Sequence, residues 1–248
     1  MKVAVVGKGG SGKTTTSAVL ARTFARRGLA TIALDCDTNP NLGLSLGLGE
    51  EISERVLAVR QAVDDGEQEH AADFDDLIHR FGVDAPDGVR LAVVNAIENP
   101  EPGCPCCGIS PERLLDQLDK GDGVIVADFE AGLGTLVRMG SNPVDVVLVV
   151  TEPTAKSLEV ARRAAALVQK ESLGRLVIAA NRVRDDADLA RIHEAFPGLD
   201  VVIIPDESEI VDAERRGESP LDSAPEAPGV RALVGLANNV WGELSPVS

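Results

Sequence analysis

Two lysines and four glycines stand close together near the start of the chain, where positions 7–15 read Gly-Lys-Gly-Gly-Ser-Gly-Lys-Thr-Thr. This segment follows an apolar run at 3–6 and precedes a helical pattern, so it matches the phosphate-binding P-loop, G-x-x-x-x-G-K-[ST], in its strand–turn–helix context. Glycines let backbone N–H groups close around phosphate oxygens, and the helix N-terminus adds the positive end of its dipole. We therefore expect Lys13 to contact the β- and γ-phosphates of a nucleotide and the Thr14 hydroxyl to bind Mg²⁺.

Acidic residues directly follow two other apolar runs. The first run, at 31–34, is followed by Asp-Cys-Asp at 35–37. Alternation along a strand places Asp35 and Asp37 on one face and Cys36 on the other. The run at 124–127 is followed by Asp128, the pattern of a Walker B strand whose carboxylate contacts Mg²⁺ directly or through water. Carboxylates at these strand ends suit Mg²⁺ and a nucleophilic water. The alternative for the first pair is a turn-forming role, and we expect Cys36 to be a small buried side chain.

Three of the four cysteines occur together, in Gly-Cys-Pro-Cys-Cys-Gly at 103–108. Thiolates bind zinc, copper(I), nickel or an iron–sulfur cluster. Tetrahedral zinc takes four ligands, and three adjacent thiols of one loop rarely reach one ion together. Two chains that each contribute Cys104 and Cys106 would complete such a site, which predicts a metal shared across a symmetric homodimer, with Cys107 as a further candidate ligand. Small buried residues or a redox pair are the structural alternatives.

Composition narrows the class of protein. A chain of 248 residues, 44% of them hydrophobic, fits one domain with a sizeable core. Aromatic residues make up only 2%, which disfavours base stacking, and the net charge of −16 disfavours contact with nucleic-acid phosphates or anionic lipids. No signal peptide is visible, and no apolar run approaches the roughly 18 residues of a membrane helix. We expect a cytoplasmic protein without nucleic-acid or membrane partners, whose thiols stay reduced.

Short apolar runs alternate with helical patterns along the chain, which is typical of an α/β fold with a doubly wound, mostly parallel sheet flanked by helices. Ligands of such sheets bind at the carboxyl ends of the strands, where the motifs above lie. We expect one domain over 1–248, with a variable acidic excursion at about 60–88 and a surface loop at 217–229. The expected strands are 3–6, 31–34, 89–94, 124–127, 144–150, 176–180 and 201–204, and the clearest helices are 14–27, 154–170 and about 230–241.

The early lysine of the P-loop, Lys8, makes the segment resemble the deviant Walker A motif of the ATPase family that includes septum-site and plasmid-partition ATPases, the nitrogenase iron protein and metal-insertion ATPases. The resemblance implies that Lys8 reaches across a dimer to the partner's nucleotide. It makes Asp37 the switch I residue that orients or deprotonates the attacking water, and it places Asp35 near the outer shell of the metal. Lys8, Lys13 and Asp37 are thus the expected catalytic residues. A solvent-exposed lysine is the alternative for Lys8.

Three further segments match the family at other strand ends. Asp128 begins Asp-Phe-Glu-Ala-Gly, which has the switch II form D-x-x-x-G, and the resemblance implies that Gly132 offers a backbone N–H to the γ-phosphate. It also implies that Asn181 reads the adenine, and that Pro205 and Asp206 form a second adenine-contacting loop; a turn-forming role is the alternative for Asn181 and Pro205. The expected nucleotide-binding residues are Gly9, Gly10, Ser11, Gly12, Lys13, Thr14, Thr15, Gly132, Asn181, Pro205 and Asp206, and the expected Mg²⁺ ligands are Thr14, Asp35 and Asp128.

The resemblance becomes more specific at the cysteines. A C-x-C before the Walker B strand and Glu-Ala-Gly in switch II resemble nickel-insertion accessory ATPases of carbon monoxide dehydrogenase, the CooC type, as do Thr-Glu-Pro-Thr at 151–154 and Ile-Pro-Asp-Glu-Ser-Glu-Ile at 204–210. Cys107 and the Leu-Gly-Thr-Leu after Gly132 depart from that pattern.

This resemblance implies an ATP-hydrolysing metallochaperone that uses ATP/ADP and Mg²⁺. It would dimerise around ATP and a cysteine-bound Zn²⁺ or Ni²⁺ and assist metal insertion into a client metalloenzyme. One alternative is a spatial regulator or partition ATPase, which should carry a basic patch. The other is an iron–sulfur-bridged ATPase like the nitrogenase iron protein.

Overall fold

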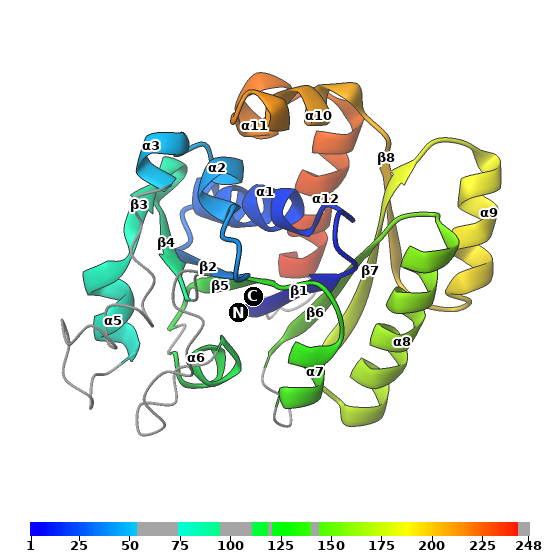
Figure 1. Ribbon diagram of the computed structural model, residues 1–248, viewed down its shortest axis with the longest axis horizontal. Coiled ribbons are helices and arrows are strands. Elements are labelled where there is room, and N and C mark those ends of the chain that lie inside the picture. The colour runs from blue at the N-terminus through cyan, green and yellow to red at the C-terminus, as the bar shows by residue number, and fades with distance from the viewer. Residues whose placement is uncertain (54–73, 95–110, 119–120, 140–143, 243–248) are drawn as a thin grey trace.

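The structure is a computed structural model, and it describes residues 1–53, 74–94, 111–118, 121–139 and 144–242. The strands in these residues are β1 (Lys2–Gly7), β2 (Thr31–Cys36), β3 (Val83–Ala85), β4 (Val89–Val93), β5 (Val124–Phe129), β6 (Val146–Thr151), β7 (Arg175–Val183) and β8 (Val201–Pro205). They form one sheet in the order β3-β4-β2-β5-β1-β6-β7-β8, in which every pairing is parallel except that of β3 with β4. The expected α/β fold with a mostly parallel sheet is therefore confirmed (Figure 1).

Seven of these strands lie where the apolar runs predict them. β5 and β6 are buried at every position, because helices cover both faces of a parallel sheet. β3 was not expected from the sequence. It is a three-residue strand that reads Val-Asp-Ala at the edge of the sheet, and so short a strand carries no readable alternation.

The second half of the segment expected as an acidic excursion, 60–88, is part of the fold. It contains β3 together with helix α5 (Phe74–Phe81) and the 3-10 turn η1 (Pro86–Gly88). β3 pairs antiparallel with β4, and Asp87 of η1 bonds to α1 (Lys13–Arg26), so residues 74–88 extend the sheet and brace a helix.

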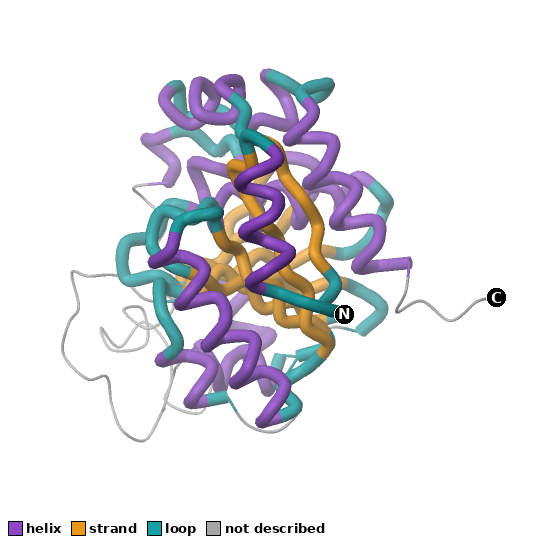
Figure 2. Tube along the Cα trace, turned by 90° about the vertical axis from the view of Figure 1, so that its right-hand side faces the viewer, coloured by secondary structure: helices purple, strands orange, loops and turns teal. Residues whose placement is uncertain are grey.

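Helices cover the sheet in two layers, and Figure 2 shows the strands enclosed between them. One layer holds α1, α2 (Leu42–Leu46), α11 (Pro220–Ser223) and α12 (Pro228–Gly242), and the other holds α5, α6 (Pro111–Gln117), α7 (Gly134–Arg138), α8 (Ala155–Glu171) and α9 (Asp186–Ala195). Successive β1 side chains alternate between the two cores: Val3 and Val5 belong to the first, Ala4 and Val6 to the second. Two short helices, α3 (Glu50–Ser53) and α10 (Ser208–Arg215), complete the described elements.

The helices begin in different ways. α8 is capped by the Thr154 hydroxyl, which accepts a hydrogen bond from the Ser157 N–H, and α9 is capped by Asp185 in the same manner. α1 instead begins after Gly12, which lies in the left-handed region (φ 94°) and has no side chain with which to cap. The first N–H groups of α1 are thus left for another partner.

The expected helices 14–27, 154–170 and 230–241 correspond to α1, α8 and α12, with ends that differ by one or two residues. The expected surface loop at 217–229 was wrong in part, because α11 lies inside it and α12 begins at Pro228. α11 starts at a proline, which supplies the φ of a first helical turn and needs no N–H partner there. No helix in the described ranges is long and apolar enough to cross a membrane.

Candidate functional site

The P-loop, residues 7–15, joins β1 to α1 through a turn that requires glycine at two positions. A Cβ added to Gly7 would lie 2.2 Å from the Val150 carbonyl oxygen, and one added to Gly12 would lie 2.3 Å from Asn181 Nδ2. Both glycines also have positive φ values, of 155° and 94°. The turn closes when the Ser11 N–H donates to the Lys8 carbonyl at 3.2 Å. The motif therefore has the tight backbone that its glycines predicted.

The two lysines of the P-loop lie in different environments. Lys13 is 7% exposed, and its Nζ donates to the Lys8 carbonyl at 3.4 Å. The Lys8 side chain is half-buried, and its Nζ contacts the Gly9 carbonyl at 3.2 Å in an exposed bond. Lys13 thus lies against the loop, whereas the Lys8 ammonium group faces outward, where a second molecule can reach it. These positions suit the roles expected for both lysines, which stay predictions.

Two buried carboxylates stand side by side at the ends of β2 and β5. Asp35 and Asp128 are aligned in the strand register and are 1% and 2% exposed. Asp35 accepts the backbone N–H of Leu42 at 2.8 Å, and Asp128 accepts the Ser17 hydroxyl at 3.2 Å and a hydrogen bond from Thr14. The three expected Mg²⁺ ligands, Thr14, Asp35 and Asp128, are therefore close together.

Burial raises the pKa of Asp35 to about 8, and the charge of Asp128 adds to this shift. Burial also raises the pKa of Asp128 to about 6, against the lowering effects of the Thr14 hydrogen bond and the Lys13 charge. Two adjacent buried carboxylates repel each other when both are ionised, and a cation bound next to them would remove this repulsion. The pair therefore favours the binding of a cation. Carboxylate and hydroxyl oxygens are the donors that Mg²⁺ prefers, so the residues fit that ion.

Asp37 forms the turn that was the alternative to its catalytic role. Its Oδ1 accepts the Asn39 N–H at 2.9 Å, an Asx turn, and the residue is half-buried. The Asp37 N–H donates to Asp35 Oδ1 at 3.2 Å, and the charge of Asp37 adds a small part to the raised pKa values of Asp35 and Asp128. The turn and a role towards water are compatible, because the carboxylate has a second oxygen.

Switch II is bonded to the P-loop in this structure. The Gly132 N–H donates to the Gly7 carbonyl at 3.2 Å, and Gly132 has a positive φ of 112°. This N–H is the group expected to reach the γ-phosphate. It must leave Gly7 to do so, and the contact stays a prediction.

The amide of Asn181 lies against the other side of the P-loop. Its Nδ2 donates to the Ser11 carbonyl at 2.9 Å, and its Oδ1 accepts the Arg182 N–H at 3.0 Å. One amide hydrogen and one lone pair remain to read an adenine edge. Asn181 also lines a cavity of about 20 Å³ together with Gly12, Pro205 and Asp206. The structure therefore brings all three residues expected at the adenine to the P-loop.

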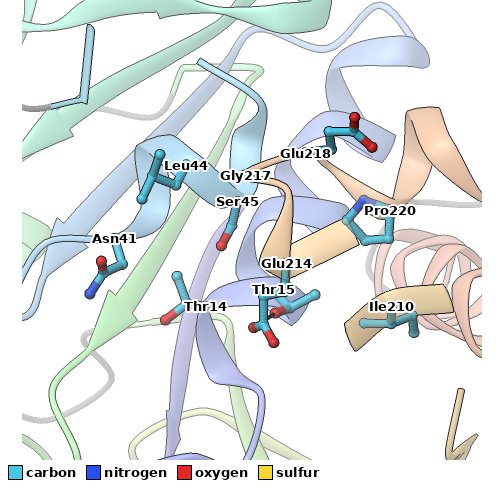
Figure 3. A pocket seen from close by; sticks show the side chains of 10 residues that line it. All are labelled: Thr14, Thr15, Asn41, Leu44, Ser45, Ile210, Glu214, Gly217, Glu218 and Pro220. Atoms are coloured by element: carbon cyan, nitrogen blue, oxygen red, sulfur yellow. Dashed lines mark hydrogen bonds between the residues drawn. The ribbon is translucent and has the colours of Figure 1, made fainter. Parts of the chain in front are cut away.

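A larger cavity of about 340 Å³ opens beside the start of α1 (Figure 3). Thr14 and Thr15 lie between its two walls, and the Thr15 hydroxyl donates to Glu214 Oε1 at 3.0 Å. One wall is formed by α2 and the residue before it, and the other by α10 and the turn into α11; the lining residues are Thr14, Thr15, Asn41, Leu44, Ser45, Ile210, Glu214, Gly217, Glu218 and Pro220. The sequence did not single out Asn41, Ser45 or Glu214, because no motif marks them.

The cysteines 104, 106 and 107 lie outside the described residues, so their arrangement stays a prediction. Cys36 is 4% exposed, and burial raises the pKa of its thiol, which agrees with the expected small core residue. In the ranges that the structure describes, no group of three or more His, Cys, Asp or Glu side chains is placed to hold a metal ion.

The chain matches the family model of the CobQ/CobB/MinD/ParA nucleotide binding domain over residues 2–221. It is 35% identical to an uncharacterized ATP-binding protein of Methanocaldococcus jannaschii, over 88% of the chain and 90% of that relative. It is 28% identical to the carbon monoxide dehydrogenase accessory protein CooC of Rhodospirillum rubrum, over 91% of each chain. The fold also resembles the septum site-determining protein MinD of Pyrococcus horikoshii complexed with Mg-ADP, with a TM-score of 0.74 and 21% identity over 96% of this chain and 95% of that one. With its P-loop, paired carboxylates and parallel sheet, the chain belongs to the CobQ/CobB/MinD/ParA family of nucleotide-binding domains.

Proposed function

We propose that the protein is an ATP-hydrolysing metallochaperone. It forms a homodimer around ATP, holds a zinc or nickel ion on Cys104 and Cys106 of both chains, and delivers metal to a client metalloenzyme. The cysteine segment at 103–108 carries this proposal, because three thiols in four residues stand in a chain that also has a complete set of P-loop and switch residues. The similarity to the carbon monoxide dehydrogenase accessory protein CooC of R. rubrum supports a carbon monoxide dehydrogenase as the class of client.

The nucleotide half of the function uses the residues at the strand ends. Lys13 binds the phosphates, and Thr14 and Asp128 hold Mg²⁺, which when bound neutralises charge on the β- and γ-phosphate oxygens. Asp37 orients the attacking water, and Lys8 acts on the nucleotide of the partner chain. Asn181 contacts the adenine. The buried Lys13, the outward Lys8 and the adjacent carboxylates support these roles.

An ion pair joins the helix after switch II to the helix that follows the cysteine segment in the chain. α6 begins three residues after the cysteine segment, and its Glu112, 8% exposed, accepts a hydrogen bond from Arg138 Nε at 2.6 Å. Arg138 ends α7, the helix directly after switch II, and Leu114 of α6 packs in the same core as Phe129 of β5. A shift of switch II would therefore act on α6. This continuity supports a metal site that responds to the nucleotide.

A spatial regulator is the second candidate, because the septum site-determining protein MinD of Synechocystis is 27% identical over 87% of this chain and 79% of its own length. Such a function predicts a basic patch or a basic terminal helix. The net charge is −16, and Arg231 is the only Lys or Arg in the sequence of α12. The charge distribution thus favours the metallochaperone.

Metal analysis of the full, reduced protein tests the proposal. Under anaerobic conditions, with Zn²⁺ or Ni²⁺ and with or without ATP, we expect one metal per two chains, bound together with dimer formation in light scattering. Cys104→Ser and Cys106→Ser should each abolish the metal, because a hydroxyl is a poor ligand for soft ions. Cys107→Ser should have a smaller effect, and Cys36→Ala is the matched control that removes a thiol elsewhere. All four variants should still bind ATP.

Full metal binding to a monomer, or metal retained by the Cys104/Cys106 double variant, would contradict the shared site and favour the spatial regulator. Visible absorption from iron and sulfide in the anaerobically purified protein would instead favour the iron–sulfur-bridged ATPase.

A further inference from the structure

Arg22 is a buried cation in the middle of α1 that no nucleotide motif includes. Its side chain is 3% exposed. The guanidinium donates to Asp87 at 2.6 Å, to both oxygens of Asp222 at 2.5 and 2.9 Å, and to the Leu46 carbonyl at 3.3 Å. A buried guanidinium is tolerated only when its donors are satisfied, so these contacts tie three separate segments to one point.

Two of the three segments are the walls of the 340 Å³ cavity. The first wall contains α2, which ends at Leu46 and begins shortly after Asp37 in the chain. Its first residue, Leu42, donates its N–H to Asp35. Asp222 belongs to α11, at the end of the arm formed by residues 208–223, whose Gly217 lines the opposite wall (Figure 3). Arg22 is therefore bonded to the end of each wall.

The two walls approach each other at the guanidinium. A Cβ added to Gly47, the residue after α2, would lie 3.7 Å from Arg22 Nη1 and 3.7 Å from Ser219 Cβ at the start of α11. The hydrogen bond from Arg22 lowers the pKa of Asp222, as expected for an ion pair that holds α11 in place. Removing the guanidinium would therefore take one hydrogen-bonding partner from each wall and leave Arg26 as the remaining arginine bonded to Asp222.

We propose that Arg22 is a positioning residue for the nucleotide reaction. It sets the distance between two parts of the site: α2, together with the switch I residue Asp37 before it, and the arm, residues 208–223. The proposal rests on the ATP hydrolysis proposed above. Arg22 is not among the residues that line the cavity, and it acts through Leu46 and Asp222. Loss of the contact to Leu46 should slow turnover, because Asp37 precedes α2. Loss of the contact to Asp222 should weaken nucleotide binding, because the arm lines the cavity.

Arg26, one turn further along α1, provides a matched control. It donates to the same Asp87 oxygen at 2.8 Å and to Asp222 at 3.0 Å, but its side chain is 41% exposed. Its hydrogen bonds go to η1 and α11, so Arg26→Gln removes a cation from the same cluster and leaves the bond between Arg22 and α2 intact.

The test measures kcat, KM and the Kd of a fluorescent ADP analogue for the full-length protein and four variants. Asp222→Asn should raise KM and Kd about fivefold with kcat within about twofold of wild type, whereas Arg22→Gln should raise both and also lower kcat about tenfold. Arg22→Lys keeps the charge but loses the planar fork, so kcat should fall as in Arg22→Gln. Arg26→Gln should change each constant by less than about twofold. Fluorescence of Trp241, the single tryptophan, reports whether each variant is folded at the assay temperature.

A purely structural role would lower the melting temperature of the Arg22 variants and leave kcat, KM and Kd at wild-type values in the folded protein, and this result would overturn the proposal. Equal kinetic effects of Arg22→Gln and Arg26→Gln would overturn it as well. A wild-type protein that binds ADP without hydrolysing ATP would instead refute the proposed ATPase function. In that case the Kd values alone decide on Arg22, because only variants that release the arm should weaken binding.

Discussion

The P-loop and the arm face the same cavity, but different forces hold them. The P-loop is fixed by backbone geometry and by buried strand ends: Gly7 and Gly12 leave no room for a side chain, and Asp35 and Asp128 are almost fully buried. The arm is held by contacts between single side chains: the exposed Glu214 accepts the Thr15 hydroxyl, and Asp222, which is 52% exposed, accepts hydrogen bonds from the buried Arg22.

The P-loop and the arm should therefore tolerate substitution to different degrees. A loop whose backbone needs glycine at fixed positions tolerates almost no substitution, so it can be recognised as a motif in the sequence. The contacts that hold the arm come from single side chains that can be replaced one at a time, and those that are exposed contribute little each. We therefore expect large, all-or-none effects from changes in the P-loop and graded effects from changes in the arm.

Substitutions of the two P-loop lysines should have the largest effects on nucleotide binding and turnover, and they test whether changes in the P-loop are all-or-none. Lys13→Ala removes the buried charge that is proposed to contact the phosphates, so nucleotide binding itself should weaken in calorimetry. Lys8→Ala should spare binding but reduce turnover about 10³-fold and weaken the ATP-bound dimer, because a charge supplied by a partner chain can be worth that much. Sedimentation and ATPase assays measure both effects. Normal turnover by Lys8→Ala would show that this lysine does not act across a dimer.

Asp37→Asn should give the next largest effect, a loss of about 10²-fold in hydrolysis with ATP binding retained. Asn is nearly isosteric and can keep the turn to the Asn39 N–H, but it is a poor base. The variant should accumulate as an ATP-bound dimer in light scattering. If Asp37 only shapes the turn, Asn serves equally well, and hydrolysis at the wild-type rate would refute the catalytic role.

Gly12→Ala should weaken nucleotide binding about tenfold, because the new Cβ displaces the Asn181 amide. The positive φ alone costs about 1–2 kcal/mol of folding stability for a residue with a Cβ. Gly28→Ala is the matched control, since Gly28 has a positive φ of 82° with no atom within 4 Å of an added Cβ. Both variants should melt earlier, but only Gly12→Ala should show a raised Kd for ADP. Equal Kd values would mean that Asn181 contributes nothing to binding.

Glu214→Gln should give the smallest effect and tests the arm half of the comparison. The glutamine carbonyl can still accept the Thr15 hydroxyl that Glu214 accepts at 3.0 Å, so the Kd for ADP should change less than about threefold. Glu218→Gln, on the same cavity, serves as the control for loss of charge. A tenfold change in Kd for Glu214→Gln alone would show that the arm is as specialised as the P-loop.

The same contrast explains what could be predicted from the sequence. Parallel strands buried on both faces are continuous apolar runs, so seven strands and the sheet type could be read directly. Lys13, Asp35 and Asp128 stand next to such strands or inside a spaced motif, and the structure brings them together. β3 and α11 escaped notice because each is a few residues long and carries no periodicity.

Residues whose importance comes only from distant neighbours could not be found in this way. Arg22 and Asp222 are 200 positions apart, and Thr15 and Glu214 are 199 positions apart. Nothing in the local pattern around these residues distinguishes them from surface charges on an amphipathic helix. Their partners are set by where α10 and α11 return to α1, which depends on the packing of the whole sheet.

The uncapped start of α1 has a thermodynamic consequence. α8 and α9 carry their own caps, whereas the first N–H groups of α1 follow a glycine that supplies none. A phosphate bound there would complete the helix, so a bound nucleotide would be part of the folded structure. By mass action, a ligand at 100 times its Kd adds about 2.7 kcal/mol to the free energy of unfolding. The resistance of this protein to heat and proteolysis in a cell should therefore follow the concentration of the nucleotide that it binds.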